Sequence, residues 1–478
     1  MITIDRALLG KDGLPDAALL LEILKVHEKN RTERLDALHE MYDRNHAITS
    51  RSRLSGLPNN KLVHDFPGYI VTMAAGYLVG KPVQYAPVKE AETAFEKVGE
   101  ALKAAKADCV DAELAVDASV YGKAVEFCYA DRDARPKVSQ INPRSAFVVY
   151  DDTVEHVSLF GVTIAKKLDR TLKENGEKIT VYTDTLIVYY ERQSSEAPRE
   201  TSRKEHYFGG VPIVEYWNNA REDSDFAPVE ALIDAYDVLQ SDRVNDKQQF
   251  TDAIMVLKGI GSLGADDTEE EEPAEDADTA DTETVELTPS QRLRQTRTLF
   301  LPGDGADANF MTKPDAESGN EVLRKSLAED IHKFSFVPDL TDENFAGNTS
   351  GVAMRFKLLG LEQITKIKER WFREGLQNRL KLFARFLSVK GAAALDVTQV
   401  QITFNRSLPV NELEIAQTLS AYDGMVPQEL LLAQVPFVED AEEAAELMAA
   451  ERAAQAKESA MMFATQPLKE KPGDKEKA

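Results

Sequence analysis

The feature that most constrains this chain is a very long helical pattern over residues 350–390. Two apolar stripes follow one another along it at slightly different angles. They consist of Leu361, Ile364, Ile367 and Trp371, followed by Phe372, Leu376, Leu380, Phe383 and Leu387. At about 1.5 Å per residue such a helix is roughly 60 Å long, too long for an ordinary domain, and Gly360 and Gly375 are its candidate hinges. Because one subunit cannot cover both faces of so long a helix, we expect neighbouring subunits to bury part of it.

The chain is strongly acidic, with 57 lysines and arginines against 82 aspartates and glutamates and a formal net charge of −25 at pH 7. A protein that grips nucleic acid tightly normally presents a basic surface, since its cations replace the phosphate counterions. The charge therefore argues against tight DNA or RNA binding, although it permits a passage through which DNA slides without being held. The segment from Val352 to Lys390 is an exception, because it holds ten basic residues and three glutamates.

The length of 478 residues and the hydrophobic fraction of 43% are sufficient for about two to four structural regions with ordinary cores. No apolar run reaches the roughly 18 residues of a membrane helix. The N-terminus lacks the pattern of a signal peptide. Cys109 and Cys128 fit no zinc motif, and we expect two reduced thiols. The protein is therefore expected to stay in the cytoplasm until it joins a larger assembly.

Helical periodicity also occurs in several shorter segments. These are residues 16–45, 61–80, 90–120, 228–258, 315–334, 410–422, 427–434 and 439–460. Residues 266–286 hold twelve acids and no base, which predicts a loop whose charges repel one another. The tail from Lys469 is expected to be disordered.

A β-rich region interrupts the helices. Its β-branched and aromatic runs are residues 124–130, 146–152, 156–168, 178–192 and 213–217. Asn175-Gly176 predicts a tight hairpin turn, and the region as a whole predicts an antiparallel arrangement. Further strands are predicted at 297–305 and 400–405. The fold class is therefore α+β, mainly helical.

The motifs that resemble catalytic or cofactor sites are weak. Residues 259–264 match GxGxxG, but the acidic run follows them instead of a helix that could hold a pyrophosphate. Two groups of acids are candidate metal ligands: Asp151 with Asp152, and Asp339 with Asp342 and Glu343. Neither group has the spacing of a calcium loop or of a two-metal site. We therefore predict no catalytic residues, no metal and no cofactor.

Four segments carry a resemblance to a known family. They are Leu57-Pro58-Asn59-Asn60-Lys61 with the following helix to GYLVGKPV (76–83), SFVPDLTDENFAGNTSGVAM (335–354), ITFNRSLPVNELE (402–414) and GMVPQELLL (424–432). In these segments, and in the order of its elements from about residue 16 to 450, the chain resembles the portal proteins of tailed bacteriophages, the head-to-tail connectors. The acidic insertion at 266–286 departs from the family where its clip region varies.

The resemblance implies a portal fold with a defined order of regions. These are a wing (1–225), a stem helix (226–258), a clip (259–312), a second stem helix (313–336), a tunnel loop (337–351), a long kinked wing helix with a strand (352–405), a helical crown (406–465) and a disordered tail (466–478). The tunnel loop would reach DNA with Asp342, Asn344, Phe345, Asn348 and Thr349, and Gly347 and Gly351 are candidate hinges in it.

The resemblance also implies partners and a location. The protein would form a ring of 12 or 13 copies at one capsid vertex of the virion, assembled in the host cytoplasm, and double-stranded DNA would pass through it during packaging and ejection. The large terminase, a head-tail adaptor, the major capsid protein and scaffolding proteins would contact it, and a membrane would not. The alternatives are another structural adaptor of the virion and a nucleic-acid-processing enzyme.

Overall fold

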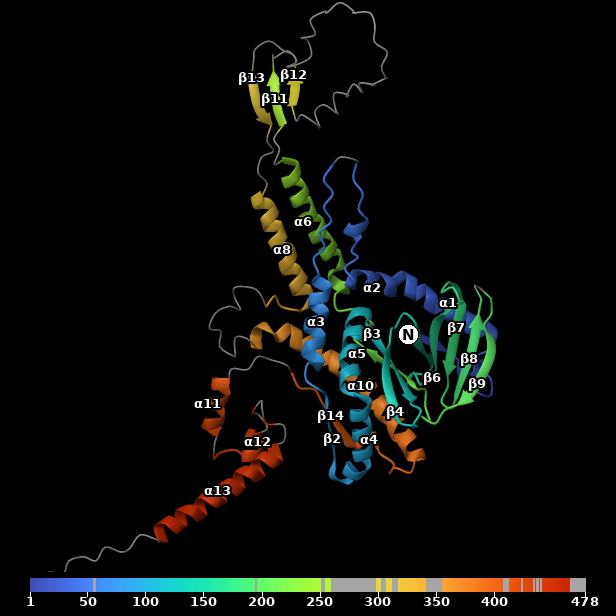
Figure 1. Cartoon of the computed structure of the whole chain (residues 1–478), viewed down its shortest axis with the longest axis vertical. Coiled ribbons are helices and arrows are strands. Elements are labelled where there is room, and N and C mark those ends of the chain that lie inside the picture. The colour runs from blue at the N-terminus through green and yellow to red at the C-terminus, as the bar shows by residue number, and fades with distance from the viewer. Residues whose placement is uncertain are drawn as a thin grey trace, which may run out of the picture. The chain divides into compact units, whose positions relative to one another are not determined.

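The structure is a computed structural model of the chain (Figure 1). It describes residues 1–54, 57–193, 196–250, 254–258, 298–301, 307–311, 317–340, 355–406, 412–422, 424–432, 435, 438 and 441–464. The chain divides into two compact units. The first, called the main unit below, comprises Met1–Leu340 with Leu358–Ser407, and the second comprises Thr341–Lys357 with Leu408–Ala478. The described elements mix helices with strands, so the predicted α+β class is confirmed.

The main unit begins with a short strand and a long helical arm. Its elements are β1 (Ile2–Ile4), α1 (Ala17–Asn30), a π-helical turn (Arg31–Leu35) and α2 (Asp36–Tyr42). The predicted helix 16–45 is thus confirmed. The carboxylate of Asp16 accepts a hydrogen bond from the backbone N–H of Leu19 at 2.8 Å, which satisfies a free amide at the helix start.

Three further helices follow where the sequence predicts two, and the bounds of both predicted helices differ from the observed ones. They are α3 (Phe66–Val79), α4 (Glu92–Ala105) and α5 (Ala107–Tyr121). The helix predicted at 61–80 begins only at Phe66, because the Asp65 carboxylate caps it by accepting from Gly68 N–H at 2.9 Å. The helix predicted at 90–120 is divided at Lys106, whose φ of 53° is left-handed.

Two sheets form the β-rich region. The larger has the order β1-β5-β6-β7-β8-β9, with β5 (Ala146–Asp151), β6 (Ser158–Leu168), β7 (Glu174–Tyr182), β8 (Leu186–Arg192) and β9 (Arg199–Glu205), and the smaller has the order β10 (Ile213–Trp217), β3 (Lys123–Ala130), β4 (Pro136–Ile141). Among the described strands of these two sheets, β1 alone pairs in parallel, with β5. All five predicted runs are strands, but the run 178–192 is two strands that a turn at Thr183 separates.

The hairpin turn predicted at Asn175-Gly176 is wrong, because both residues lie inside β7. The turn lies at residues 169–173. There the Asp169 carboxylate accepts from the backbone N–H groups of Thr171 at 2.6 Å and Lys173 at 3.0 Å. An aspartate that bonds its own following backbone in this way makes a turn without a glycine.

The longest helix of the described residues is α10 (Leu359–Val389), which is shorter than predicted, roughly 46 Å at 1.5 Å per residue. One face of it, with Phe372, Leu376, Leu380 and Phe383, is buried in a cluster that also holds apolar residues of α4, α5 and β10. Beside it, β14 (Val400–Thr403) pairs with β2 (Gln84–Pro87), so the strand predicted at 400–405 is confirmed.

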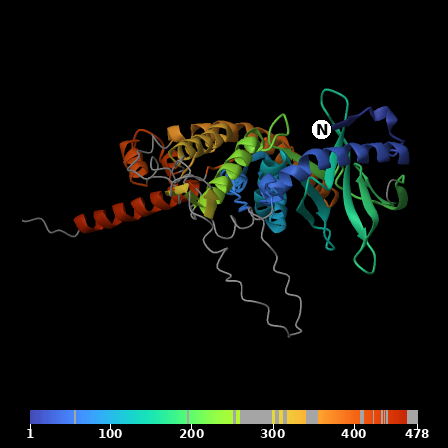
Figure 2. The same ribbon diagram turned by 90° about the horizontal axis from the view of Figure 1, so that it is seen from above.

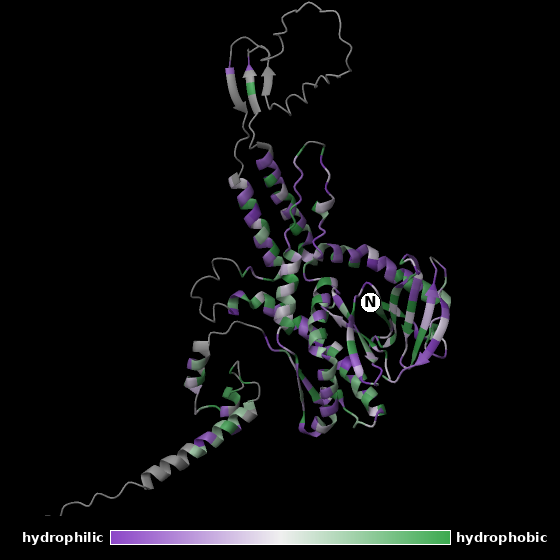
Figure 3. Ribbon diagram, in the orientation of Figure 1, coloured by the Kyte–Doolittle hydropathy of each residue, from purple (hydrophilic) through white to green (hydrophobic). Residues whose placement is uncertain are grey.

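A pair of polar helices also belongs to the main unit. They are α6 (Glu230–Phe250) and α8 (Glu317–Ser335), and the chain between them contains β11 (Ile254–Lys258), β12 (Thr298–Leu301) and β13 (Asp307–Met311). Figures 1 and 2 show the two helices side by side, and Figure 3 shows how many of their residues are hydrophilic. The end of the predicted helix 228–258 is strand β11 instead. The GxGxxG match and the acidic run lie outside the described residues.

The second unit contains α11 (Glu412–Tyr422), α12 (Gln428–Leu432) and α13 (Ala441–Ala464). These agree with the three helices predicted there. The tail from Lys469 lies outside the described residues. Within the described part of the chain, every helix is too short or too polar to cross a membrane.

Candidate functional site: a polar helix pair and its anchors

A row of buried polar side chains on α6 holds this helix in place. Asp237, Ser241 and Asn245 follow one another at intervals of four residues, and each is 0% exposed. They accept hydrogen bonds from backbone N–H groups of the non-helical segment 57–64. The N–H of His64 donates to Asp237 Oδ1 at 2.9 Å, that of Leu62 to Ser241 Oγ at 3.0 Å, and that of Asn60 to Asn245 Oδ1 at 2.7 Å. We call segment 57–64 the strap and these three bonds the ladder.

The ladder forms because two backbone repeats nearly match. Residues four apart on an α-helix are about 6 Å apart along its axis, and amides two apart on an extended segment are about 6.6 Å apart. The strap runs antiparallel to α6, and each bond satisfies a buried donor and a buried acceptor together. The Asn60 side chain strengthens the last position by donating to Asn245 Oδ1 at 2.9 Å and to Gln248 Oε1 at 2.7 Å.

Two histidines complete the first position of the ladder. Asp237 contacts His46 Nδ1 at 2.5 Å and His64 Nδ1 at 2.8 Å, and His46 Nε2 lies 3.1 Å from the Met41 carbonyl oxygen. Because both ring nitrogens of His46 face acceptors, both donate, which requires the imidazolium form. Burial is the largest single effect on the pKa of His46 and lowers it, but the hydrogen bond and negative charge of Asp237, with the Met41 carbonyl and Asp234, together leave the pKa above its usual value. Burial is likewise the largest effect on the pKa of Asp237 and raises it, but the hydrogen bonds from His46 and His64 and the charge of His46 together leave that pKa below its usual value.

An aromatic cluster joins the helix pair to the start of α3. The Tyr236 ring of α6 meets His64 and Phe66 edge-on, with centroids 4.8 and 5.1 Å away. His332 of α8 meets Phe66 at 5.8 Å and Tyr69 at 5.6 Å. The strap and α3 therefore contact both helices of the pair through ring edges, in a geometry that aromatic pairs favour.

Polar contacts between the two helices give their direction. Arg324 of α8 donates to the Tyr236 hydroxyl at 3.3 Å, and Arg243 of α6 lies 3.2 Å from Glu321. Since the residue number rises along α6 while it falls along α8, the helices are antiparallel.

The same cluster anchors the base of the predicted tunnel loop. After α8, Phe336 adopts a left-handed φ of 60°. The Tyr69 hydroxyl then donates to the Pro338 carbonyl at 2.8 Å and accepts from Leu340 N–H at 3.1 Å. On the return, a Cβ added to Gly360 would lie 3.5 Å from the Phe336 carbonyl oxygen, so the two ends of the intervening segment lie together. The predicted residues between them, Asp342, Asn344, Phe345, Gly347, Asn348, Thr349 and Gly351, lie outside the described part.

Gly375 has a packing reason to be glycine. A Cβ at this position would lie 2.4 Å from Cδ1 of the buried Tyr216 ring. Close approach of a helix to an aromatic ring requires a missing side chain here. The hinge roles of Gly360 and Gly375 stay predictions.

The chemistry of the helix pair is that of an acidic surface. The two helices carry five acids and two bases in α6, and four acids and three bases in α8, and without the buried Asp237 the net charge is −3. The described residues contain no group of three or more His, Cys, Asp or Glu arranged to hold a metal ion. The carboxylate of Asp151, a candidate metal ligand in the sequence, accepts hydrogen bonds from Thr153 Oγ1 at 2.7 Å and from Val157 N–H at 2.9 Å within a turn. Such a surface can repel or pass a polyanion.

Comparison with known families agrees with a structural role. A family model described as phage portal protein, SPP1 Gp6-like, matches residues 21–458. The match spans nearly the whole chain, so this protein belongs to the phage portal protein family, whose members are structural components of the virion. The resemblance seen in the sequence is thus confirmed.

Two curated relatives match over most of their length. The portal protein of Clostridium phage phiCD119 is 24% identical over 418 residues, which cover 83% of this chain and 86% of the relative. The portal protein of Bacillus phage SPP1 is 25% identical over 403 residues, which cover 80% of this chain and 75% of the relative.

Sequence reasoning missed the ladder and the histidines. A signal for it exists, because Asp237, Ser241 and Asn245 are small polar residues on one face of a predicted helix. Its partners are amides of a segment that begins about 180 residues earlier, however, and nothing in the local pattern pairs the two.

Proposed function

We propose that this chain is the portal subunit that forms a ring at one capsid vertex and a channel for genome packaging and ejection. The observation that carries the proposal is the acidic antiparallel pair α6 and α8, held to the body by the ladder and the aromatic cluster. The family membership supports the same role.

The proposed regions follow the order expected from the sequence. Residues 1–225 and 352–405 form the wing, 226–258 and 313–336 the stem, 259–312 the clip, 337–351 the tunnel loop and 406–465 the crown. In this arrangement the stem helices line the channel. Their net negative charge repels DNA phosphates, so DNA slides without forming salt-dependent grips on the wall.

The proposed partners follow from these regions. The clip contacts the large terminase and later the head-tail adaptor, and the wing and crown contact the major capsid and scaffolding proteins. A ring of 12 or 13 copies carries a charge of roughly −300, since twelve copies each contribute −25. Basic patches between subunits are needed to offset that repulsion.

The test is to image the purified full-length protein by negative-stain microscopy after a scan of concentration and salt by light scattering. We expect rings in top view with a central hole wide enough for duplex DNA. A mass near the monomer's 53.1 kDa at every concentration would contradict the proposal. A ring whose hole is too narrow for DNA would favour a different structural adaptor of the virion.

The role of the tunnel loop needs a separate experiment. Gly347→Val introduces a β-branched residue that resists a positive φ, so it stiffens the proposed hinge. We expect normal rings and less DNA per particle in an in vitro packaging assay. Normal packaged length would remove this hinge from the translocation mechanism.

A further inference from the structure

The outer face of α10 is incompletely covered within the main unit. Ile367, Trp371, Glu374, Asn378, Lys381 and Arg385 follow one another at alternating intervals of four and three residues. We call these six residues the outer seam. Three of the four charged or polar positions are exposed, and Ile367 is 50% exposed. These intervals average 3.6 residues, the period of an α-helix, so the six side chains form one continuous stripe along α10.

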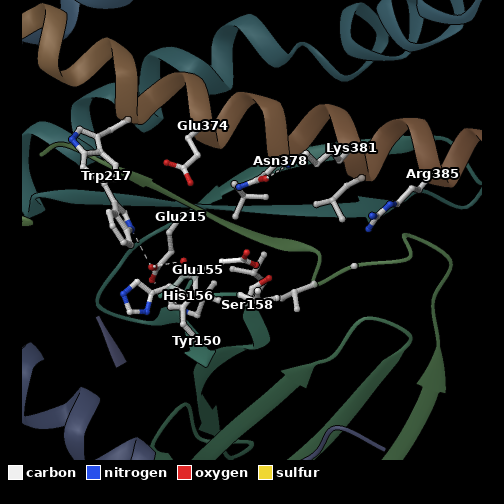
Figure 4. Close-up of a pocket in the computed structure, with 18 residues that line it drawn as sticks. Tyr150, Glu155, His156, Ser158, Glu215, Trp217, Glu374, Asn378, Lys381 and Arg385 are labelled. Atoms are coloured by element: carbon white, nitrogen blue, oxygen red, sulfur yellow. Dashed lines mark hydrogen bonds between the residues drawn. The ribbon is translucent and has the colours of Figure 1, made fainter. Parts of the chain in front are cut away.

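The outer seam has an apolar part and a polar part. At the apolar part, Trp371 lies against Trp217 of β10, with ring centroids 5.2 Å apart. At the polar part, Asn378, Lys381 and Arg385 line a cavity of about 470 Å³ between α10 and the edge of the sheets, which Figure 4 shows in close-up. The face therefore offers a place for another molecule to enter.

The charge of this face selects the partner. Arg370, beside the seam, and Lys381 and Arg385 within it outnumber Glu374, on a chain whose net charge is −25. A partner that covers the seam must therefore present acids. The chain as a whole has that sign, with a net charge of −25, so a second copy is a partner of the right charge.

An exposed row of acids on α4 fits the seam. Glu92, Glu96 and Glu100 are exposed, and Val88, 46% exposed, precedes them at the same interval of four residues. Among the described residues, no ion pair is formed by these three glutamates. The acids span about 12 Å along the helix, and Arg370 and Lys381 are about 16 Å apart, a difference that long side chains can bridge.

The two surfaces belong to different helices of one body. Val98 and Leu102 of α4 and Leu376 and Leu380 of α10 are buried in the same apolar cluster, which leaves the outer seam and the acidic row as two separate surfaces. A contact between two different surfaces of identical subunits is head-to-tail, and it closes into a ring when the rotation permits.

We propose that the outer seam of α10 binds the acidic row of α4 in the next copy of this chain. The proposal rests on the ring-forming function proposed above and names the surfaces that make the ring. The apolar part of the seam packs near Val88, and the cations meet the glutamates.

The experiment is a charge swap. The variant Arg370→Glu/Lys381→Glu reverses the seam, and it spares Arg385, which donates to the Gly209 carbonyl at 2.6 Å. The control Lys25→Glu/Lys29→Glu makes the same charge change on the exposed face of α1. A third variant adds Glu96→Lys/Glu100→Lys to the reversed seam. Assembly is followed by sedimentation velocity over a concentration series, and the melting temperature of dilute monomer checks the fold.

We expect the seam reversal to raise the concentration for half-assembly at least 10-fold over the control, and the added α4 changes to restore most of the loss. Assembly of the reversed seam at the same concentration as the control would overturn the proposal and leave the ring function intact. Loss without restoration would show that the acidic row of α4 is not the partner. Absence of rings in the unaltered protein would instead contradict the proposed function itself.

Discussion

Helices α10 and α6 lie in the same unit, but different forces hold them. α10 buries Phe372, Leu376 and Leu380 in an apolar cluster, whereas α6 is held by the ladder of Asp237, Ser241 and Asn245. Apolar burial is strong and has little directional preference, while hydrogen bonds are weaker in net energy and fix position. The difference indicates that α10 supplies the stability of the body and that the ladder sets where the helix pair stands on it.

The largest expected effect tests Arg379, a charged side chain of α10 that is buried in the body. Arg379 is 0% exposed and lies 2.6 Å from Asp111 and 2.7 Å from Glu126. Arg379→Met should destabilise the body by about 3–5 kcal/mol, because it leaves two carboxylates buried without a cation. Urea unfolding of dilute monomer measures the loss.

The matched control is Arg370→Met, an exposed arginine on the same helix, which should change stability by about 0.5 kcal/mol or less. Addition of Asp111→Asn and Glu126→Gln to Arg379→Met should recover part of the loss. Equal losses for the two arginines would mean that the buried cluster does not anchor α10.

The next effect concerns how closely α10 packs. Gly375→Ala places a methyl group 2.4 Å from Tyr216 Cδ1 and should cost about 3 kcal/mol, since a packed core accommodates extra volume poorly. Gly360→Ala meets its nearest atom only at 3.5 Å and should be neutral or stabilising, because alanine favours helix. Thermal unfolding compares the two variants. Identical melting temperatures of Gly375→Ala and Gly360→Ala would show that close packing does not require glycine at position 375. Bending of the helix would then remain as the reason for this glycine.

A smaller effect is expected from removing one position of the ladder. Asn245→Ala leaves the buried amide of Asn60 without its acceptor and should cost about 2 kcal/mol. Amide hydrogen exchange should become faster at Asn60 and Leu62 and stay unchanged in α10. Val238→Ala, on the exposed side of α6, is the control and should alter neither. Unchanged exchange at Leu62 in Asn245→Ala would show that each bond acts alone.

The smallest effect depends on pH. The pKa of His46 is raised in the folded state, so its contribution is fully present below about pH 6.5 and is lost as the pH rises through the folded value. His46→Gln should therefore lower stability by about 1–2 kcal/mol near pH 6, and by less toward pH 9. Calorimetry of dilute monomer from pH 5.5 to 9 measures the difference, with the exposed His156→Gln as the control. A difference that is constant with pH would contradict protonation of His46.

Local patterns predicted the helices and most strands well. The second stripe of α10, Phe372 to Leu387, is a packing face as its sequence predicts, because buried apolar residues repeat with the helix period. Strands β1, β2, β4, β9, β11 and β13 were not predicted, and β9 shows one physical reason. β9 is exposed at every position and reads RETSRKE, so it lacks the alternation that burial of one face imposes.

The remaining features depend on contacts far apart in sequence. Asp169 and Asn175-Gly176 can each form a tight turn, and only the pairing of β6 with β7 decides that the turn lies at Asp169. The ladder joins segments about 180 residues apart, and the Tyr69 hydroxyl bonds the Pro338 carbonyl about 270 residues later. Of the candidate site, the sequence therefore predicts the two helices α6 and α8, and it does not predict what holds them.

The spacing of the ladder restricts how α6 can move along its own axis. Because acceptors recur only every four residues, a slide of 1 or 2 Å would lengthen all three bonds together, and the next register lies a full turn, about 6 Å, away. In a register shifted by one turn, Leu62 N–H would face Asn245 instead of Ser241, and Asp237 would lose His64 N–H. The helix therefore cannot shift gradually along its axis, and it keeps one register until all three hydrogen bonds break together.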